Sequence, residues 1–175
     1  MKKLLLIFVS VSILIIPSCS TPNSEETFND VLSLKKAQKV MNFTAHLSGD
    51  QEVPAVETEA TGQALFQLSK DGYSLSYKLI VANIDSVRMA HIHLAPAGVN
   101  GAVVVWLYPS GPPPVLIEGT TNGILAEGVI TETNLVGPLL GESFSALVDA
   151  LSSGNAYVNV HTEAYPGGEI RGQIK

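Results

Sequence analysis

The stretch Tyr73-Ser74-Leu75-Ser76-Tyr77-Lys78-Leu79-Ile80-Val81 decides the fold class, because apolar residues recur along it at every second position. This period is that of a β-strand with one buried face, whereas a helix repeats about every 3.6 residues. The same alternation recurs in Phe43-Thr44-Ala45-His46-Leu47 and in Ala64-Leu65-Phe66-Gln67-Leu68. The chain is therefore predicted to be strand-rich from about residue 41 onward.

Turn-forming residues separate these strands from further candidates, as in Lys70-Asp71-Gly72 and Tyr165-Pro166-Gly167-Gly168. Only Ser143 to Leu151 has helical spacing, with Phe144 and Leu147 on its apolar face. A count of about eight strands predicts an all-β fold, either an antiparallel β-sandwich with Greek-key-like connections and one short helix or a flattened barrel. The remaining strand candidates are 88–94, 102–108, 123–131, 156–162 and 169–175.

Composition fits one globular domain, with 46% hydrophobic and 15% charged residues in a chain of 175. Lys and Arg number 10 against 16 Asp and Glu, which gives a net charge of -6 and disfavours nucleic acid as a partner. The sequence contains no Gly-rich phosphate loop, no Gly-x-Ser-x-Gly and no Cys-x-x-Cys. We therefore expect a protein that is not an enzyme.

The first 19 residues have the order of an export signal. Lys2 and Lys3 precede an apolar run from Leu4 to Ile16, which is shorter than the roughly 18 to 20 residues of a membrane-spanning helix. Ile16-Pro17-Ser18-Cys19 resembles the lipobox of bacterial lipoproteins, which implies lipidation of Cys19, the only cysteine. The prediction is a signal peptide over 1–18, a lipidated tether over 19–40 and a domain over 41–175, held at the periplasmic or cell-surface face of a membrane. An ordinary secreted protein is the alternative.

Three of the four histidines lie on polar faces of predicted strands. The alternation in Ala90-His91-Ile92-His93 places both imidazoles on one side, and that in Tyr157 to Thr162 places Asn159 and His161 together. Imidazole suits copper and zinc, so His91, His93 and His161 form a candidate metal site if the strands are neighbours. The alternative is that these histidines bind backbone carbonyls or carboxylates and fix loops.

Five further residues are candidates for supporting the histidines. Glu163 or Glu169 would add an oxygen ligand, and Asn159 shares the face of His161. Glu52 would reach either the metal or Arg171, and Arg171 is expected to pair with Glu169, its neighbour on the same strand face.

Several ordered motifs together resemble the CHRD (chordin-type) domain. They are Leu47 to Pro54, Gly62-Gln63-Ala64, Ala90-His91-Ile92-His93 followed by Gly98 to Gly101, Tyr157 to Thr162, and Pro166 to Ile174. The resemblance covers 41–175 and implies an all-β extracellular domain. It suggests a binding module and supplies no catalytic residues.

A weaker resemblance is to copper/zinc superoxide dismutase, a β-sandwich in which a His-x-His strand faces copper. That enzyme has more histidines than the four present here, an ordered zinc loop, and a disulfide that a lone Cys19 cannot form. The predicted function is thus a membrane-anchored, extracytoplasmic and non-catalytic binding or structural module, whose partner is an unidentified extracellular or periplasmic protein or glycan. The alternative is a copper or zinc binding protein, and a dismutase-like enzyme is the remote alternative.

Overall fold

The computed structural model describes residues 41–175, which form seven β-strands and one α-helix. The elements are β1 (Asn42–Ser48), β2 (Thr61–Leu68), β3 (Leu75–Leu94), β4 (Ala102–Tyr108), β5 (Ile117–Ile130), α2 (Phe144–Ser152), β6 (Ala156–Thr162) and β7 (Ile170–Gln173). Short 3-10 turns lie at Gly49–Gln51, Glu132–Asn134 and Gly137–Leu139. Within 41–175, none of the helical segments has the length and apolar character required to cross a membrane. The predicted signal peptide, Cys19 and the tether lie outside the described residues.

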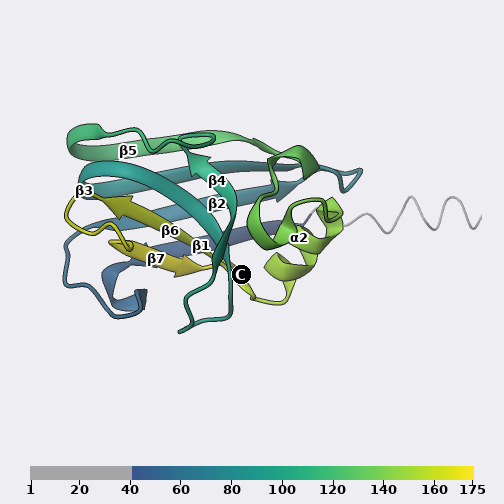
Figure 1. Cartoon of the computed structure of the whole chain (residues 1–175), viewed down its shortest axis with the longest axis horizontal. Helices are drawn as coiled ribbons and strands as arrows, with labels where there is room; N and C mark the ends of the chain where they lie inside the picture. The colour runs from purple at the N-terminus through teal and green to yellow at the C-terminus, as the bar shows by residue number, and fades with distance from the viewer. Residues whose placement is uncertain (1–40) are drawn as a thin grey trace, which may run out of the picture. The chain divides into compact units, whose positions relative to one another are not determined.

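Five strands close into a ring by antiparallel pairing, in the order β2, β1, β7, β6, β3 and back to β2. The all-β, antiparallel prediction is confirmed, but the pairings form a closed barrel where separate sheets of a sandwich were the first expectation (Figure 1). In the ring, β1, β2 and β3 follow one another in the chain, as do β6 and β7. The chain passes from β3 to β6 through β4, β5 and α2, and the last strand, β7, closes the ring against the first, β1. The Greek-key-like crossing predicted from the sequence is therefore not present in the ring.

The strand count is seven because β3 joins two segments that the sequence predicted as separate strands, 73–81 and 88–94. Its first half pairs with β2 and β5, and its second half pairs with β6 and β4. Between the halves, Asn83 and Ser86 take positive φ angles of 55° and 52°, and the pairing with β5 shifts register. These residues bend the strand without ending it.

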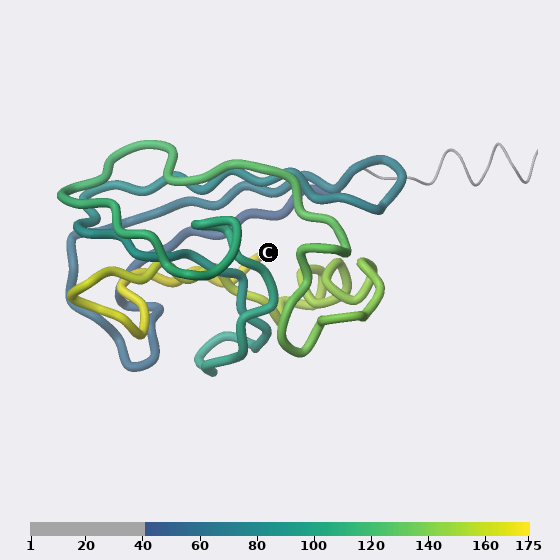
Figure 2. Tube along the Cα trace, turned by 45° about the horizontal axis from the view of Figure 1, so that its top comes forward, coloured from purple at the N-terminus to yellow at the C-terminus, as the bar shows by residue number. Residues whose placement is uncertain are grey.

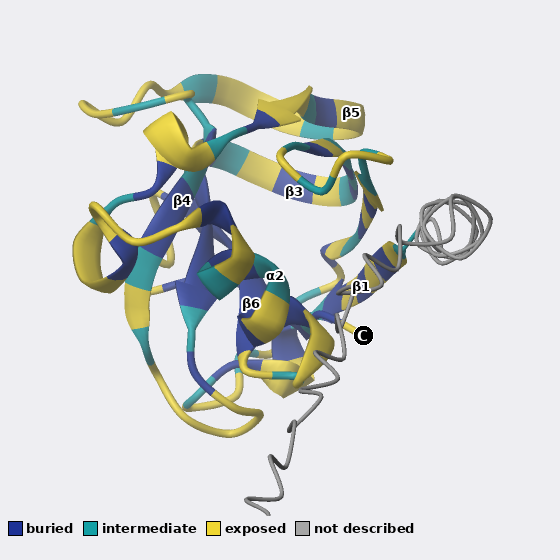
Figure 3. Ribbon diagram, turned by 90° about the vertical axis from the view of Figure 1, so that its right-hand side faces the viewer, coloured by how far each residue is buried: buried dark blue, intermediate teal, exposed yellow. Residues whose placement is uncertain are grey.

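The predicted helix is confirmed as α2, which follows Ser143 at its N-cap and buries Phe144, Leu147 and Leu151 in the main core. It lies at one end of the barrel, beside β6 (Figure 3). β5 pairs with β3 and stands outside the ring, and much of its surface is exposed.

Apolar residues fill the barrel because they alternate along the strands, as Phe43, Ala45 and Leu47 do in β1. In β6 both faces are buried: Val158 and Val160 belong to the core, while the alternate residues are polar. Three segments, 49–60, 95–101 and 163–169, reach this polar side through hydrogen bonds, and the first and third lie side by side (Figure 2). The polar residues of β3, β6 and β7 are therefore buried outside the barrel interior.

Candidate metal centre

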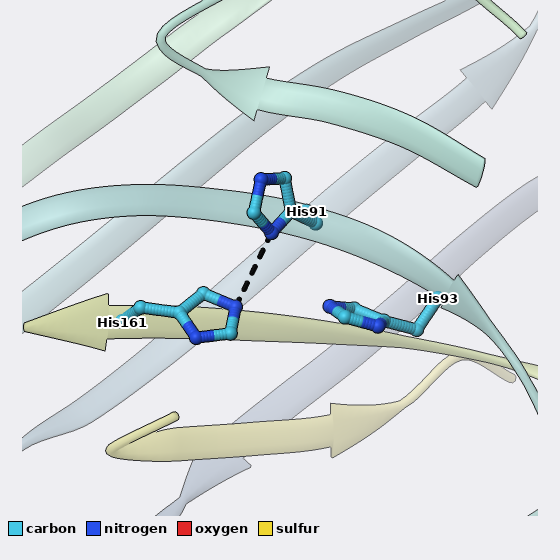
Figure 4. A group of neighbouring side chains, drawn as sticks. All are labelled: His91, His93 and His161. Atoms are coloured by element: carbon cyan, nitrogen blue, oxygen red, sulfur yellow. Dashed lines mark hydrogen bonds between the residues drawn. The ribbon is translucent and has the colours of Figure 1, made fainter. Parts of the chain in front are cut away.

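The strand register brings His91, His93 and His161 together, and we call these three residues the histidine cluster. In the β3–β6 ladder, His91 pairs with Asn159, His93 with Tyr157, and Met89 with His161. Directly paired residues project to the same side of a sheet, so both strands contribute to one polar face. The three side chains point toward one another (Figure 4), and one possible ligand atom from each lies within 4.8 Å of the others. They are 2%, 8% and 5% exposed in sequence order.

Backbone carbonyls determine which nitrogen of each ring is available. His93 Nδ1 lies 3.0 Å from the carbonyl oxygen of Gly101, and His161 Nδ1 lies 3.0 Å from that of Pro166. Because a carbonyl only accepts hydrogen bonds, both Nδ1 atoms carry the proton and both Nε2 atoms keep a free lone pair. His91 Nδ1 lies 3.2 Å from His161 Nε2 and donates to it, and His91 Nε2 is buried without a partner among the described residues.

The histidine cluster is held in its neutral form. Burial, together with a smaller effect of the neighbouring imidazoles, lowers the pKa of His91 to about 3 and that of His161 to about 4, and the Pro166 carbonyl opposes the shift at His161. Burial also lowers the pKa of His93, with an opposing effect from the Gly101 carbonyl and a further lowering by Arg171. Neutral imidazoles are the form that coordinates metal ions.

The spacing of these nitrogens suits a shared ion. Two nitrogens bound to one tetrahedral zinc at about 2.0 to 2.1 Å lie about 3.4 Å apart. His91 Nδ1 and His161 Nε2 are 3.2 Å apart, and His91 offers Nδ1 as a ligand when its proton is on Nε2, the other tautomer of the neutral ring. The widest pair has to close by at most about 1.4 Å from its 4.8 Å limit. A carbonyl behind the other ring nitrogen, as at His93 and His161, is the usual second layer of a histidine metal site.

Arg171 orders the loop that carries the Gly101 carbonyl. Its guanidinium donates to the carbonyl oxygens of Pro96 at 3.3 Å and Val99 at 2.8 Å, and to Asn100 Oδ1 at 3.2 Å. Its Cζ atom also lies 3.4 Å from the ring centre of Tyr157. That ring stacks on His93 at a centroid distance of 4.9 Å, so Arg171 supports His93 through both the loop and the ring.

The expected ion pair between Arg171 and Glu169 is not formed, and this prediction was wrong. Glu169 instead accepts hydrogen bonds of 2.7 Å from Thr58 Oγ1 and Thr162 Oγ1, which tie the 49–60 segment to β6. Both carboxylate oxygens are thereby occupied, and Glu169 does not belong to the group of potential ligands. Glu163 is exposed and does not belong to the group of potential ligands either.

Glu52 and Asn159 form a second buried polar pair beside the cluster. Asn159 Nδ2 donates to Glu52 Oε2 at 3.4 Å, whereas Glu52 Oε1 and Asn159 Oδ1 have no hydrogen-bond partner within residues 41–175. Both side chains pack against Gly168, where a Cβ atom would lie 2.4 to 2.5 Å from their polar atoms. Burial raises the pKa of Glu52 to about 7, although Arg171 opposes the shift.

Three neighbours of the cluster were not among the candidate site residues. The ring of Trp106 on β4 lies edge-on to that of His91, with centroids 4.3 Å apart, and His91 Nε2 points toward β4 (Figure 4). Tyr157 stacks on His93, and Met89 pairs with His161. Alternation along β3 already put Met89 on the face of His91, but the pairing with Trp106 depends on the β3–β4 register, which the sequence does not state.

The fold and site define a closed β-barrel domain with a buried histidine cluster on its covered outer face. The model of the CHRD domain family matches residues 43–174, and the chain belongs to this family. Neither the comparison with curated proteins nor that with solved structures gave a match.

Proposed function

We propose that this protein binds one copper or zinc ion through His91, His93 and His161. The observation that carries the proposal is the convergence of three neutral nitrogens, with Nδ1–H groups of His93 and His161 fixed by backbone carbonyls. Loop fixation alone accounts for those two Nδ1 contacts. It leaves unexplained why His93 Nε2 is buried without a hydrogen-bond partner in residues 41–175. A role in binding is favoured over catalysis because the three side chains are at most 8% exposed.

The test is titration of the full chain with Cu(II) and Zn(II), followed by fluorescence of Trp106. This residue is the only tryptophan, and its ring contacts His91, so an ion at the cluster changes its emission. A Cys19→Ser background removes the only thiol. We expect one equivalent to bind at a micromolar Kd or below.

Matched variants locate the ion. His91→Ala/His93→Ala is expected to abolish binding, and His161→Ala to weaken it strongly. His46→Ala is the control, because His46 is the fourth histidine and lies exposed on β1. A chain that binds no metal, or a His46→Ala variant that loses binding as the double variant does, contradicts the proposal.

We also propose that the domain acts outside the cytoplasm on a lipid anchor. The order of Lys2, Lys3, the apolar run and Cys19 supports export and lipidation, and CHRD membership agrees with an extracytoplasmic module. Expression in a lipoprotein-processing bacterium, with detergent phase partition, tests the anchor. The protein is expected in the membrane fraction and Cys19→Ser outside it. A Cys19→Ser variant that partitions like the parent contradicts lipidation.

The other candidate function is a non-catalytic module that binds an extracellular or periplasmic protein or glycan. One observation favours it: Ile124 and Val129 on β5 are 55% and 57% exposed, on a strand that stands outside the barrel. Glycan-array binding by the full chain, compared with an Ile124→Ser/Val129→Ser variant, tests this surface. Equal signals from the two proteins contradict a role for β5 in glycan binding.

A further inference from the structure

The formal charges around the histidine cluster set which ions it accommodates. The three imidazoles are uncharged, and no carboxylate in residues 41–175 joins them in the ligand group. A buried cation, Arg171, lies close by: it is 1% exposed and packs on the Tyr157 ring, which in turn stacks on His93. Because the cost of burying an ion rises with the square of its charge, this environment penalises a divalent ion more than a monovalent one.

Neighbouring carboxylates do not offset that penalty. Glu169 is occupied by two threonine hydroxyls, and Glu163 is exposed to solvent. Glu52 contacts Asn159, and none of its contacts is to a cluster nitrogen. No carboxylate in residues 41–175 is therefore a ligand that would neutralise a divalent ion, and the charge interaction of Glu52 is with Arg171.

A soft donor lies next to the cluster in the strand register. Met89 pairs directly with His161 across the β3–β6 ladder, two residues before His91, and is partly buried. A thioether is a weak ligand for zinc and a favourable one for Cu(I). The only other sulfur in the described residues belongs to Met41, which precedes β1.

We infer that the histidine cluster selects copper in its cuprous state, with Met89 adding a thioether ligand to the three imidazoles. This inference rests on the proposed metal site and specifies its ion. Burying a monovalent ion among these neutral donors costs less free energy than burying a divalent one. A soft donor such as a thioether also binds Cu(I) in preference to Zn(II). The protein is then a carrier or store of Cu(I).

The experiment is an anaerobic competition for Cu(I) between the full chain, in the Cys19→Ser background, and the chromophoric chelator bicinchoninate. A parallel competition with a zinc chelator measures the Zn(II) affinity. We expect one equivalent of Cu(I), bound at least about 1000-fold more tightly than Zn(II). Met89→Leu is expected to weaken Cu(I) binding by about tenfold and to leave Zn(II) binding unchanged.

Met41→Leu is the matched control and is expected to change neither affinity. Zn(II) binding as tight as that of Cu(I) overturns the selectivity while leaving the proposed metal site standing. Unchanged Cu(I) affinity in Met89→Leu overturns the thioether ligand. Failure to bind either ion refutes the proposed function itself.

Discussion

Replacing Arg171 with lysine tests whether this one side chain holds the 95–101 loop on the barrel. Arg171 makes three charge-assisted hydrogen bonds to that loop and stacks on Tyr157. Lysine keeps the charge, but its single ammonium group cannot reproduce the planar fork. Loss of two such bonds at about 1.5 kcal/mol each lowers the free energy of unfolding by about 3 kcal/mol.

Urea unfolding followed by Trp106 fluorescence measures this change. With a slope of about 2 kcal/mol per M, a loss of about 3 kcal/mol moves the midpoint down by about 1.5 M. Arg88→Lys is the control, because Arg88 is the only other arginine and its side chain is exposed. If Arg171→Lys costs less than about 1 kcal/mol, the hydrogen bonds do not stabilise the loop as argued.

Two further changes test other buried features. The pKa of Glu52 is raised from 4.5 to about 7 in the fold, so its contribution to stability is present below about pH 4.5 and lost as the pH rises through 7. The lowered pKa values of His91 and His161 make stability rise over the same range, so the effect of Glu52 is measured as a difference between proteins. From pH 5 to pH 8 the parent should lose about 2 kcal/mol relative to Glu52→Gln, whereas exposed Glu57→Gln should keep the parent's profile. Parallel profiles in all three proteins would contradict the burial argument. Gly172→Ala places a Cβ 2.3 Å from the backbone oxygen of His46, so it should lower the free energy of unfolding by about 3 kcal/mol and with it the melting temperature. Gly111→Ala is the control and should be neutral, because a Cβ there lies in open space. Equal melting temperatures for the two variants would refute the close approach of β1 and β7.

Local patterns predicted much of this fold. Alternation identified β1, β2, β6 and both halves of β3, because each buries one apolar face in the barrel. The prediction that the two halves are separate strands was wrong. Asn83 and Ser86 are of residue types that form turns, but here they bend one continuous strand. The start of β5 was missed because residues 117–122 are largely exposed and lack an apolar alternation.

For the site, alternation placed His91 and His93 on one face, and the structure adds which strand lies opposite. Only the β3–β6 register brings His161 to them, and register is a property of the whole sheet. The predicted ion pair of Arg171 with Glu169 was wrong. It was based on their closeness along one strand, whereas the Glu169 carboxylate accepts its hydrogen bonds from Thr58 and Thr162. Carbonyls of Gly101 and Pro166 carry no side-chain signal, so their role in fixing the imidazoles was not predictable.

The shared strand β3 constrains how this domain can vary in length. Its first half is paired on both sides by β2 and β5, and its second half by β6 and β4. A one-residue insertion in either half would turn every following side chain to the opposite face, and His91 and His93 would exchange places with core residues. Relatives that carry the His-x-His pair should therefore keep the spacing within β3 and accommodate insertions in the connection between β4 and β5, where Gly111 stands in open space.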